Sequence, residues 1–345
     1  MLKAKQPTIS DVARRANVSI KTVSRVFNQS PNVSDSKKQS VLSAAKELGY
    51  RPNHAARRLA GSKSFVIAHF HDNSNADYVS KIYDGLHMAC TDIGYYVVAE
   101  KLDVQSDSYV DACEKYLNNH DVDGIILTPP VCDDVSLLNF LDEAGLIYAR
   151  ISPYQRAEDG TSVYIDDRAA AAQMTEYLIR LGHERIAFIA GPANHGASMA
   201  RLHGFEQVMR NAFPNSDAPL ILQGDFSTKS GFVSFEEIRK TNQKVTAIFA
   251  ANDEMAVGSL MAAYRDNIRV PEDLSIVGFD NSRLSEIIWP PLTTVKQPIQ
   301  EMAERVATLL LGSIRSGKSV QIQEKFDIEV TKRMTSSPIN APIAK

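Results

Sequence analysis

The chain has 345 residues and a formal net charge of −3, with 44% hydrophobic and 23% charged residues. This composition is typical of a soluble globular protein with two or three domains. No stretch approaches the roughly 20 apolar residues of a membrane span, and the first residues lack the apolar segment of a signal peptide, so we expect neither membrane insertion nor secretion. Cys90, Cys113 and Cys132 are odd in number and have no C-x-x-C spacing, which argues against a disulfide framework or a zinc site and favours a reducing cytoplasm.

Charge is divided unevenly along the chain. Residues 1–64 contain 13 Lys and Arg against 3 Asp and Glu, a net charge of +10, whereas the remaining residues contain 25 against 38, a net charge of −13. A basic head on an acidic body predicts that the head binds a polyanion. Nucleic acid is the first candidate, and an acidic membrane surface is the alternative.

The head begins with two short helical patterns. Residues 8–16 place apolar side chains at i, i+3, i+4 and i+7, and Thr8 can cap this helix with Asp11 in its first turn. After a tight turn, Ser19 can cap a second helix over residues 20–28. The expected buried residues of this second helix are Val23 and Phe27.

A third helix is predicted from a cap at Ser34 to Gly49, which supplies the left-handed residue after the helix. Val41, Ala45 and Leu48 lie on one face of it. Two short helices separated by a tight turn are typical of a helix-turn-helix module. We therefore predict an all-α DNA-binding domain over residues 1–50.

The second helix of such a module enters the major groove with its N-terminal end first, so its exposed early residues are the candidate base readers. These are Ile20, Lys21 and Arg25. Lys and Arg can donate to guanine O6 and N7, and Ile can contact a thymine methyl group. Four more residues are suited to bonding phosphates: Ser19, Thr22, Ser24 and Asn28. The alternative is that these side chains are merely solvated.

Three segments of the head, residues 8–13, 18–26 and 48–53, resemble the lactose/galactose repressor (LacI/GalR) family of bacterial transcription regulators in order and spacing. The resemblance continues through nearly the whole chain. It implies a regulator that binds a palindromic operator in double-stranded DNA as a homodimer and that a small-molecule effector controls.

Residues 51–64 are the predicted hinge and linker. Asn53 can cap a helix over residues 54–60 that is too short to persist alone in water. The resemblance implies that two such helices of a dimer pack in the DNA minor groove, where Leu59 wedges into the central base step. Asn53, Ala56 and Arg57 are the other expected DNA contacts in this segment. A flexible linker is the alternative.

Beyond residue 64, short apolar runs alternate with amphipathic helical patterns. The runs lie at 65–70, 96–99, 124–127, 146–151, 186–189, 247–250 and 274–279. This alternation predicts parallel sheets with helices on both faces, and about 280 residues are enough for two such units. The expected fold is therefore an all-α helix-turn-helix head followed by an α/β core of two doubly wound parallel-sheet subdomains.

Ligands of parallel sheets bind beyond the carboxyl ends of the strands. This rule selects the following polar candidates: His71, Asp72, Thr128, Arg150, Asn252, Asp253 and Asp280. Phe226 and Trp289 could offer apolar faces. Hydrogen-bonding groups beside an aromatic ring suggest a polyhydroxylated, sugar-like effector.

Four segments of the body resemble the effector-binding core of the same family, which is similar to periplasmic sugar-binding proteins: residues 181–192, 201–205, 251–253 and 270–280. The resemblance implies that Arg201, Asn252 and Asp280 bind the effector and that Phe226 packs on it. Arg150 stands where the lactose repressor has an aspartate, so a different sugar, or an acidic one paired with Arg150 and Arg201, is an alternative to a galactoside. A purely internal salt bridge between Arg201 and Asp280 is the competing interpretation.

Residues 290–295 resemble the crossover between the two subdomains in this family. Each subdomain of the core, residues 65–337, is therefore expected to be discontinuous, 65–163 with 294–323 and 164–293 with 324–337. The tail, 338–345, follows. Residues 334–345 contain no leucine heptad, so we expect a dimer without a tetramerising coiled coil.

An enzyme has little support in the sequence. Residues 196–200 lack the final glycine of a G-x-S-x-G elbow, and the phosphate-loop, H-E-x-x-H and G-x-G-x-x-G patterns do not occur. The eight His have no ligand spacing, so we expect no metal and no cofactor. The predicted function is a repressor of carbohydrate uptake or catabolism genes. Two alternatives stay open: a purine or other non-sugar effector or corepressor, and a core that dimerises without sensing.

Overall fold

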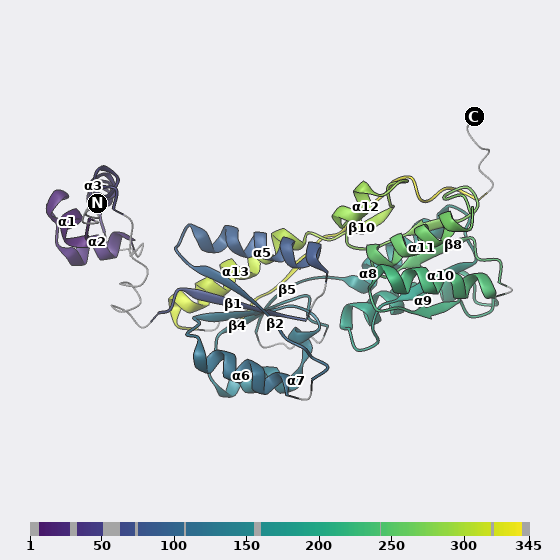
Figure 1. Ribbon diagram of the computed structural model, residues 1–345, viewed down its shortest axis with the longest axis horizontal. Coiled ribbons are helices and arrows are strands. Elements are labelled where there is room, and N and C mark those ends of the chain that lie inside the picture. The colour runs from purple at the N-terminus through teal and green to yellow at the C-terminus, as the bar shows by residue number, and fades with distance from the viewer. Residues whose placement is uncertain are drawn as a thin grey trace, which may run out of the picture. The chain divides into compact units, whose positions relative to one another are not determined.

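The structure is a computed structural model that describes residues 7–27, 33–50, 63–72, 75–106, 108–154, 160–241, 243–318 and 321–339. The chain divides into two compact units, residues 1–65 with 91–95 and residues 66–90 with 96–345, and each is described by itself. Figure 1 labels their elements. Within the described ranges, no helix is both long enough and apolar enough to cross a bilayer.

The described residues of the N-terminal unit form three helices: α1 (Ile9–Arg15), α2 (Ile20–Phe27) and α3 (Asp35–Leu48). α1 begins with a reciprocal capping box, in which the Thr8 hydroxyl accepts from the Asp11 N–H and the Asp11 carboxylate accepts from the Thr8 N–H at 2.9 Å. Ser19 caps α2 by accepting from the Thr22 N–H at 3.1 Å. The predicted start and type of the first two helices are thus confirmed.

The two ends of α3 differ from each other. Gly49 follows the helix with a φ of 65°, the left-handed conformation expected of it. Ser34 stands at the predicted N-cap position, but its side chain makes no cap hydrogen bond and lies 3.5 Å from the Ser36 hydroxyl instead. Ser34 therefore marks where the helix begins without capping it through its side chain.

One fully buried valine from each helix occupies the centre of the head: Val12, Val23 and Val41. Phe27 was expected in this core, but Val26 is the buried residue and Phe27 is only partly buried. Both residues lie on the α2 face that carries Val23, three and four positions later. Phe27 covers the edge of the core, where its ring packs against Tyr50 with the ring centroids 5.7 Å apart.

The larger unit contains a six-stranded sheet whose neighbouring strands are all parallel. Its order is β11-β5-β4-β3-β1-β2. The strands are β1 (Val66–His71), β2 (Tyr96–Lys101), β3 (Gly124–Leu127), β4 (Tyr148–Ile151), β5 (Thr161–Ile165) and β11 (Gln323–Phe326). Nearly every residue of β1 and β3 is buried, as continuous apolar runs predict for central strands, whereas β2 lies at the edge and is largely exposed.

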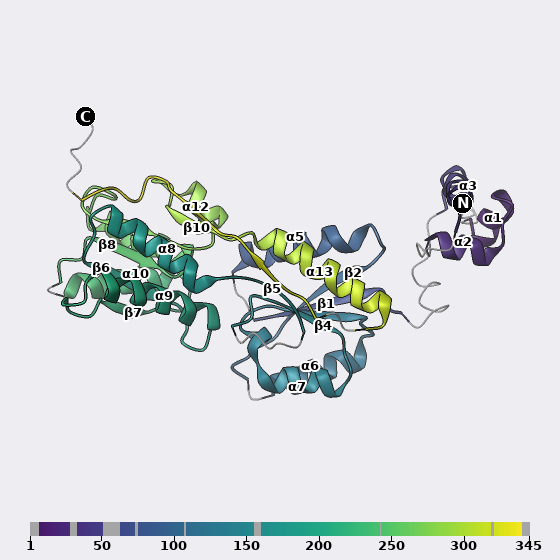
Figure 2. The same ribbon diagram turned by 180° about the vertical axis from the view of Figure 1, so that it is seen from behind.

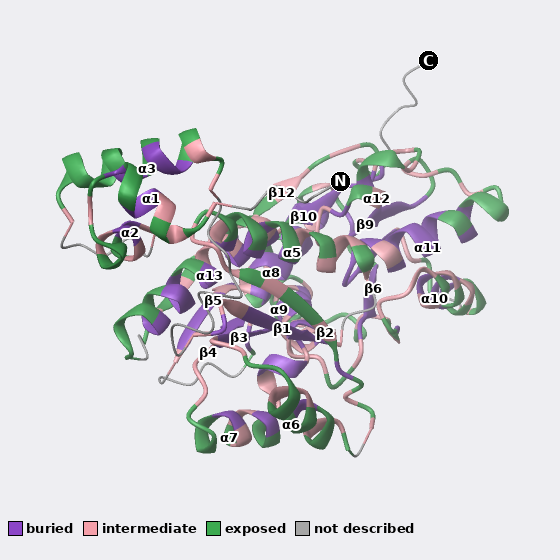
Figure 3. Cartoon of the chain, turned by 60° about the vertical axis from the view of Figure 1, so that its left-hand side comes forward, coloured by how far each residue is buried: buried purple, intermediate pink, exposed green. Residues whose placement is uncertain are grey.

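Helices cover both faces of this first sheet. They are α5 (Ala76–Thr91), α6 (Tyr109–Asn119), α7 (Val135–Glu143) and α13 (Ile299–Ser316), with a short 3₁₀ turn η1 (Val131–Asp133) before α7. Figures 1 and 2 show α5 and α13 on one face and α6 and α7 on the other. Figure 3 shows the buried strands between helices whose outer faces are exposed.

The second sheet has four parallel strands in the order β7-β6-β8-β9. Its strands are β6 (Ile186–Ala190), β7 (Ile221–Gln223), β8 (Ala247–Ala250) and β9 (Ser275–Val277). Its helices are α8 (Asp167–Arg180), α9 (Gly196–Ala212), α10 (Thr228–Lys240), α11 (Asp253–Arg265) and the short α12 (Arg283–Ile287). They pack in pairs, α8 with α9 and α10 with α11.

Both sheets are assembled from separated segments of chain. In the described residues the chain passes from one subdomain to the other three times: between β5 and α8, between β10 (Thr294–Lys296) and α13, and between β11 and β12 (Glu329–Thr331). β10 and β12 pair antiparallel with each other. The first sheet runs on to residues 165 and 326, a little past the expected boundaries at 163 and 323.

Gly204 sets how closely α9 packs on α8. A methyl group there would collide with the backbone oxygen of Arg168, so Gly204→Ala is expected to lower the free energy of unfolding by about 1–3 kcal/mol through overpacking. Gly312 on α13 is the control, because a Cβ there meets no atom within 4 Å. Gly312→Ala is expected to raise stability by about 0.5–1 kcal/mol. Urea unfolding compares the two variants, and losses of equal size would contradict this account.

Candidate functional site

A small pocket lies where the carboxyl ends of the two sheets face each other. Its volume is about 70 Å³, and residues of both subdomains line it. Four of the predicted effector residues are among them: Arg201, Phe226, Asn252 and Asp280. The strand-end rule and the resemblance therefore lead to side chains that the fold brings together.

Arg201 is the centre of the pocket's polar network. It projects from the first half of α9 and is only 6% exposed. Its Nε donates to Asp167 Oδ1 at 2.8 Å, its Nη1 donates to the Ala251 carbonyl at 2.7 Å, and the same Nη1 lies 3.5 Å from Asp280 Oδ1. The guanidinium also stacks on the Phe279 ring, 3.7 Å from its centroid. Arg201 and Asp280 are thus both an ion pair and part of a pocket wall.

Of the two carboxylates paired with Arg201, Asp280 lies farther from the guanidinium than Asp167 does, at 3.5 Å against 2.8 Å. It stands after β9 with a φ of 118°, and it accepts from the Gln297 amide at 2.6 Å. Burial raises the pKa of the Asp280 carboxyl to about 6, while the charge of Arg201 opposes that rise. At neutral pH, the summed negative charge of Asp167 and Asp280 equals or exceeds the positive charge of Arg201. The pocket has no spare positive charge in this network.

Asn252 serves the fold as well as the pocket. It is the N-cap of α11, where its Oδ1 accepts from the Met255 N–H at 3.0 Å. Its amide group donates to the Phe226 carbonyl at 2.9 Å and to Glu254 Oε2 at 3.0 Å. Both amide hydrogens have partners in this arrangement, so a ligand that accepts from Asn252 would have to replace one of them.

Phe226 and His195 form the apolar side of the pocket. Phe226 has a φ of 67° and its ring packs so closely on Gly191 that a Cβ there would collide with it. The His195 ring meets it edge-on, with the centroids 5.1 Å apart. Burial, helped by the charge of Arg201, lowers the pKa of His195 to about 3, so this ring is neutral. No hydrogen-bond partner for its buried Nδ1 lies among the residues that the structure describes.

Five polar candidates of the strand-end rule do not line this pocket: His71, Asp72, Thr128, Arg150 and Asp253. Asp72 accepts from the Val104 N–H at 3.3 Å, and the Thr128 hydroxyl bonds His69 Nε2 at 3.1 Å in the sheet interior. Arg150 is 4% exposed and donates to the Cys132 carbonyl at 3.4 Å. Asp72 and Thr128 directly follow strands of the first sheet and Arg150 lies within β4, and each of these bonds is to a residue of that subdomain. Trp289, which could have offered an apolar face, is 76% exposed and does not line the pocket.

Several residues that line the pocket were not predicted from the sequence: Asn75, Tyr78, Pro129, Ser152, Asp167, His195, Ala197 and Gln297. Asp167 comes shortly after β5, but β5 has no continuous apolar run and was not predicted, so the strand-end rule did not select Asp167. Asn75 and His195 lie at or before helix starts, for which the rule makes no selection.

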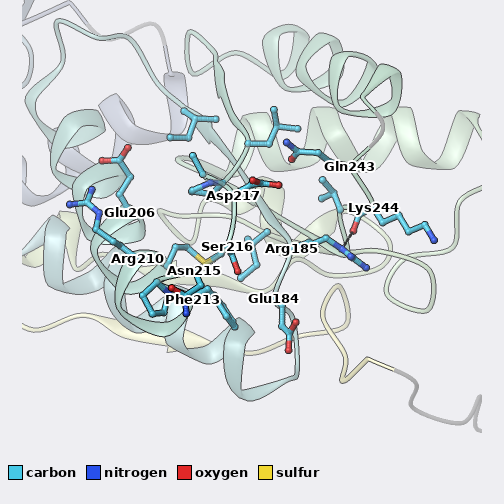
Figure 4. Close-up of a pocket in the computed structure, with 18 residues that line it drawn as sticks. Glu184, Arg185, Glu206, Arg210, Phe213, Asn215, Ser216, Asp217, Gln243 and Lys244 are labelled. Atoms are coloured by element: carbon cyan, nitrogen blue, oxygen red, sulfur yellow. Dashed lines mark hydrogen bonds between the residues drawn. The ribbon is translucent and has the colours of Figure 1, made fainter.

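A second, wider pocket of about 940 Å³ lies at the opposite end of the second sheet, beside the residues that begin β6 and β7 (Figure 4). Glu206 and Arg210 of α9 lie on one side of it, and Arg185 and Lys244 on the other. Phe213 is its aromatic residue. Within the described residues, no group of three or more His, Cys, Asp or Glu is placed to hold a metal ion.

The predicted base-reading residues of α2 are exposed to solvent, as expected of a recognition helix. Ile20 is 50% exposed, and Lys21 and Arg25 are exposed, while Ser19 and Thr22 bond each other through their hydroxyls at 2.9 Å. Ser24 is half-buried. The remaining predicted contacts lie outside the described residues: Asn28, Asn53, Ala56, Arg57 and Leu59.

Family models match both parts of the chain. The model of bacterial regulatory proteins of the lacI family matches residues 8–53, and that of the periplasmic binding protein-like domain matches residues 175–336. The HTH-type transcriptional repressor PurR of Salmonella newport is 33% identical over 334 residues, 95% of either chain. The chain belongs to the LacI family of transcriptional regulators.

Solved structures of LacI-family regulators resemble the whole chain. The complex of the transcriptional regulator CelR with cellobiose has 32% sequence identity and a TM-score of 0.73, covering 96% of this chain and 100% of that one. The lac repressor dimer bound to operator and the anti-inducer ONPF has 28% identity and a TM-score of 0.75 over the same shares. The predicted fold class, a helix-turn-helix head with an α/β core, is confirmed.

Removing Arg201 would leave two buried carboxylates without their cation. Arg201→Met is expected to lower the free energy of unfolding by about 3–5 kcal/mol at pH 7.5. The loss should be smaller at pH 5, because Asp280 can take up a proton and become neutral. Arg210→Met, an exposed position on the same helix, should cost less than about 0.5 kcal/mol. Urea unfolding at the two pH values measures this, and a pH-independent loss would contradict the charge argument.

Proposed function

We propose that this LacI-family regulator represses genes for carbohydrate uptake or catabolism, and that a neutral sugar bound between the two subdomains controls its binding to an operator. The observation that carries the proposal is the pocket itself, in which Arg201, Asp280 and Asn252 lie beside the Phe226 ring. Paired charged groups and amides next to an aromatic face suit a ligand rich in hydroxyl groups. The bound cellobiose of CelR supports the same ligand class.

The charge balance favours a neutral sugar over an acidic one. Arg201 is already matched by Asp167 and Asp280, and Arg150, the other arginine considered for an acidic ligand, bonds within the first subdomain. Binding a carboxylate here would add a negative charge to a network that has no excess of positive charge. A sugar hydroxyl can both accept from Arg201 and donate to Asp280.

The size of the pocket indicates that the cleft opens to admit its ligand. Ligand pockets typically measure about 300–1,000 Å³, whereas this one measures about 70 Å³. The structure is therefore a closed arrangement with space for little more than water. Entry of a sugar requires the two subdomains to separate about the crossing segments.

We propose that α2 reads the operator through Ile20, Lys21 and Arg25, and that the protein acts as a homodimer on an inverted repeat. The operator-bound lac repressor dimer supports this assembly. Large apolar side chains exposed on the second subdomain offer a surface for the contact between protomers: Met261, Tyr264, Ile287 and Trp289. The chain is inferred to be a cytoplasmic regulator rather than an enzyme, since its relatives are transcriptional regulators.

Arg25→Ala is expected to weaken operator binding by about 1–3 kcal/mol and to relax the preference at one base pair of each half-site. Operators selected in vitro from random duplexes, followed by gel-shift titration on mutated sites, measure both effects. Arg210→Ala is the matched control, because it removes the same charge outside the head. An unchanged base preference in Arg25→Ala would remove this residue from the readout.

Cellobiose and other neutral sugars, acidic sugars and a purine base are compared by thermal shift. A true effector at 100 times its Kd should stabilise the protein by about 2.7 kcal/mol. Phe226→Ala should abolish most of that stabilisation, whereas Phe213→Ala, which removes the aromatic ring of the second pocket, should leave it intact. The reverse pattern would move the effector to the second pocket, and stabilisation by the purine alone would contradict the sugar proposal.

A further inference from the structure

Glu254 joins the two subdomains through a single carboxyl group. It lies in the first turn of α11, and its Oε2 accepts from the Asn252 amide of the same subdomain at 3.0 Å. Its Oε1 accepts from the amide of Asn75, which immediately precedes α5 of the first subdomain, at 2.5 Å. Both asparagines line the pocket. Glu254 therefore connects one wall of the pocket to the other.

Two further hydrogen bonds cross the cleft beside it. Lys81 of α5 donates through Nζ to the Asn281 carbonyl at 2.9 Å, and Asp77 of α5 accepts from the Arg283 N–H at 3.3 Å. Lys81 and Asp77 also form an ion pair with each other at 3.0 Å. These contacts hold the same end of α5 against the second subdomain, so Glu254 belongs to a cluster of closing contacts.

We propose that the Glu254 carboxyl is a latch that closes the effector cleft, and that closure, and with it effector affinity, depends on pH near neutrality. This inference rests on the proposed effector site and adds its regulation. Glu254 acts through Asn75 and Asn252, so it is a positioning residue rather than a ligand contact.

The groups around Glu254 disfavour its negative charge when the cleft is closed. Asp280 faces it from the loop after β9, Asp77 from α5, and Asp253 precedes it on α11. The nearby cations, Arg201 of α9 and Lys81 of α5, are already paired, Arg201 with Asp167 and Asp280 and Lys81 with Asp77.

Burial first, and then the charge of Asp280, raise the pKa of Glu254 from 4.5 to about 7, although the Asn75 hydrogen bond opposes the rise. Opening the cleft removes Asn75 and admits water, which returns the pKa toward its ordinary value. The closed form therefore holds a proton on Oε2, which gives up the bond from Asn252 while Oε1 still accepts from Asn75, and the open form releases this proton. Closure is favoured at low pH, and this advantage is lost as the pH rises toward and through 7. Between pH 6 and pH 8 the ratio of closed to open forms should fall about tenfold.

The test measures closure directly. Spin labels are placed at Lys115→Cys on α6 and Arg210→Cys on α9, both exposed positions in different subdomains, and the labelled protein is diluted with unlabelled protein. Pulsed dipolar spectroscopy of the full-length protein then gives the populations of the two inter-label distances. We expect their ratio to change about tenfold between pH 6 and pH 8, and Glu254→Gln to abolish this change because its amide does not titrate.

Two further variants complete the design. Asn75→Ala, which removes the partner across the cleft, should enlarge the open population at both pH values. Glu176→Gln on α8, an exposed carboxylate paired with Arg180, should keep the full pH response. A response that persists in Glu254→Gln, or an absence of any response in the unmodified protein, would overturn the proposal.

The affinity for the effector is measured separately from the distance between the spin labels. Because the closed form leaves a pocket of only about 70 Å³, titration calorimetry with cellobiose should give an affinity about tenfold lower at pH 6 than at pH 8, and equal affinities in Glu254→Gln. If cellobiose fails to bind at either pH, the sugar proposal loses that ligand, while the distance measurement still decides whether Glu254 is the latch.

Discussion

The ion pairs of Arg201 with Asp167 and Asp280 are the interaction on which the pocket depends. The three residues come from α9, from the start of α8 and from the loop after β9, so the network ties together the segments that line the second subdomain's side of the cleft. A buried guanidinium without these carboxylates, or the carboxylates without it, would be costly to keep out of water. The same requirement fixes the geometry of the site and limits the charge of what can bind there.

Three consecutive residues at the N-terminus of α11 have different structural roles. Asn252 caps the helix, Asp253 accepts from the Thr294 hydroxyl at 2.5 Å and the Ser282 N–H at 2.7 Å, and Glu254 reaches the other subdomain. Helix N-termini favour negative charge, which helps to place two carboxyl groups side by side. Burial and the neighbouring Asp280 nevertheless raise the pKa of Asp253 well above its ordinary value. The stability of this helix start and the closing of the cleft thus depend on the same few side chains.

The sequence predicts more of the fold than of the pocket residues. Apolar runs locate β1 to β4, β6, β8 and β9 because buried parallel strands need continuous apolar sequence, but they miss β5 and the edge strands β7 and β11. Capping residues locate α1 and α2. The strand-end rule finds Asn252 and Asp280, yet it also selects Thr128 and Arg150. Sequence order places a residue at the end of a strand, but only the packed structure decides whether its side chain bonds inside the sheet or faces the cleft. His195 follows no strand directly and carries no local signal, so its place beside Phe226 emerges only from the packing of α9.

The first subdomain connects the cleft, where we propose that the effector binds, to the head, which we propose binds DNA. β1 begins at Val66, directly after the predicted hinge, so any signal carried along the chain from the cleft to the head leaves through the subdomain that contains Asn75 and α5. An effector that favours one arrangement of the cleft can alter DNA binding only by as much as DNA binding alters effector affinity. The Glu254 contact with Asn75 stabilises a closed arrangement whose pocket is too small for a sugar. A sugar must therefore supply the free energy of opening this contact, and the direction of its effect on repression follows from which form the paired heads require on the operator.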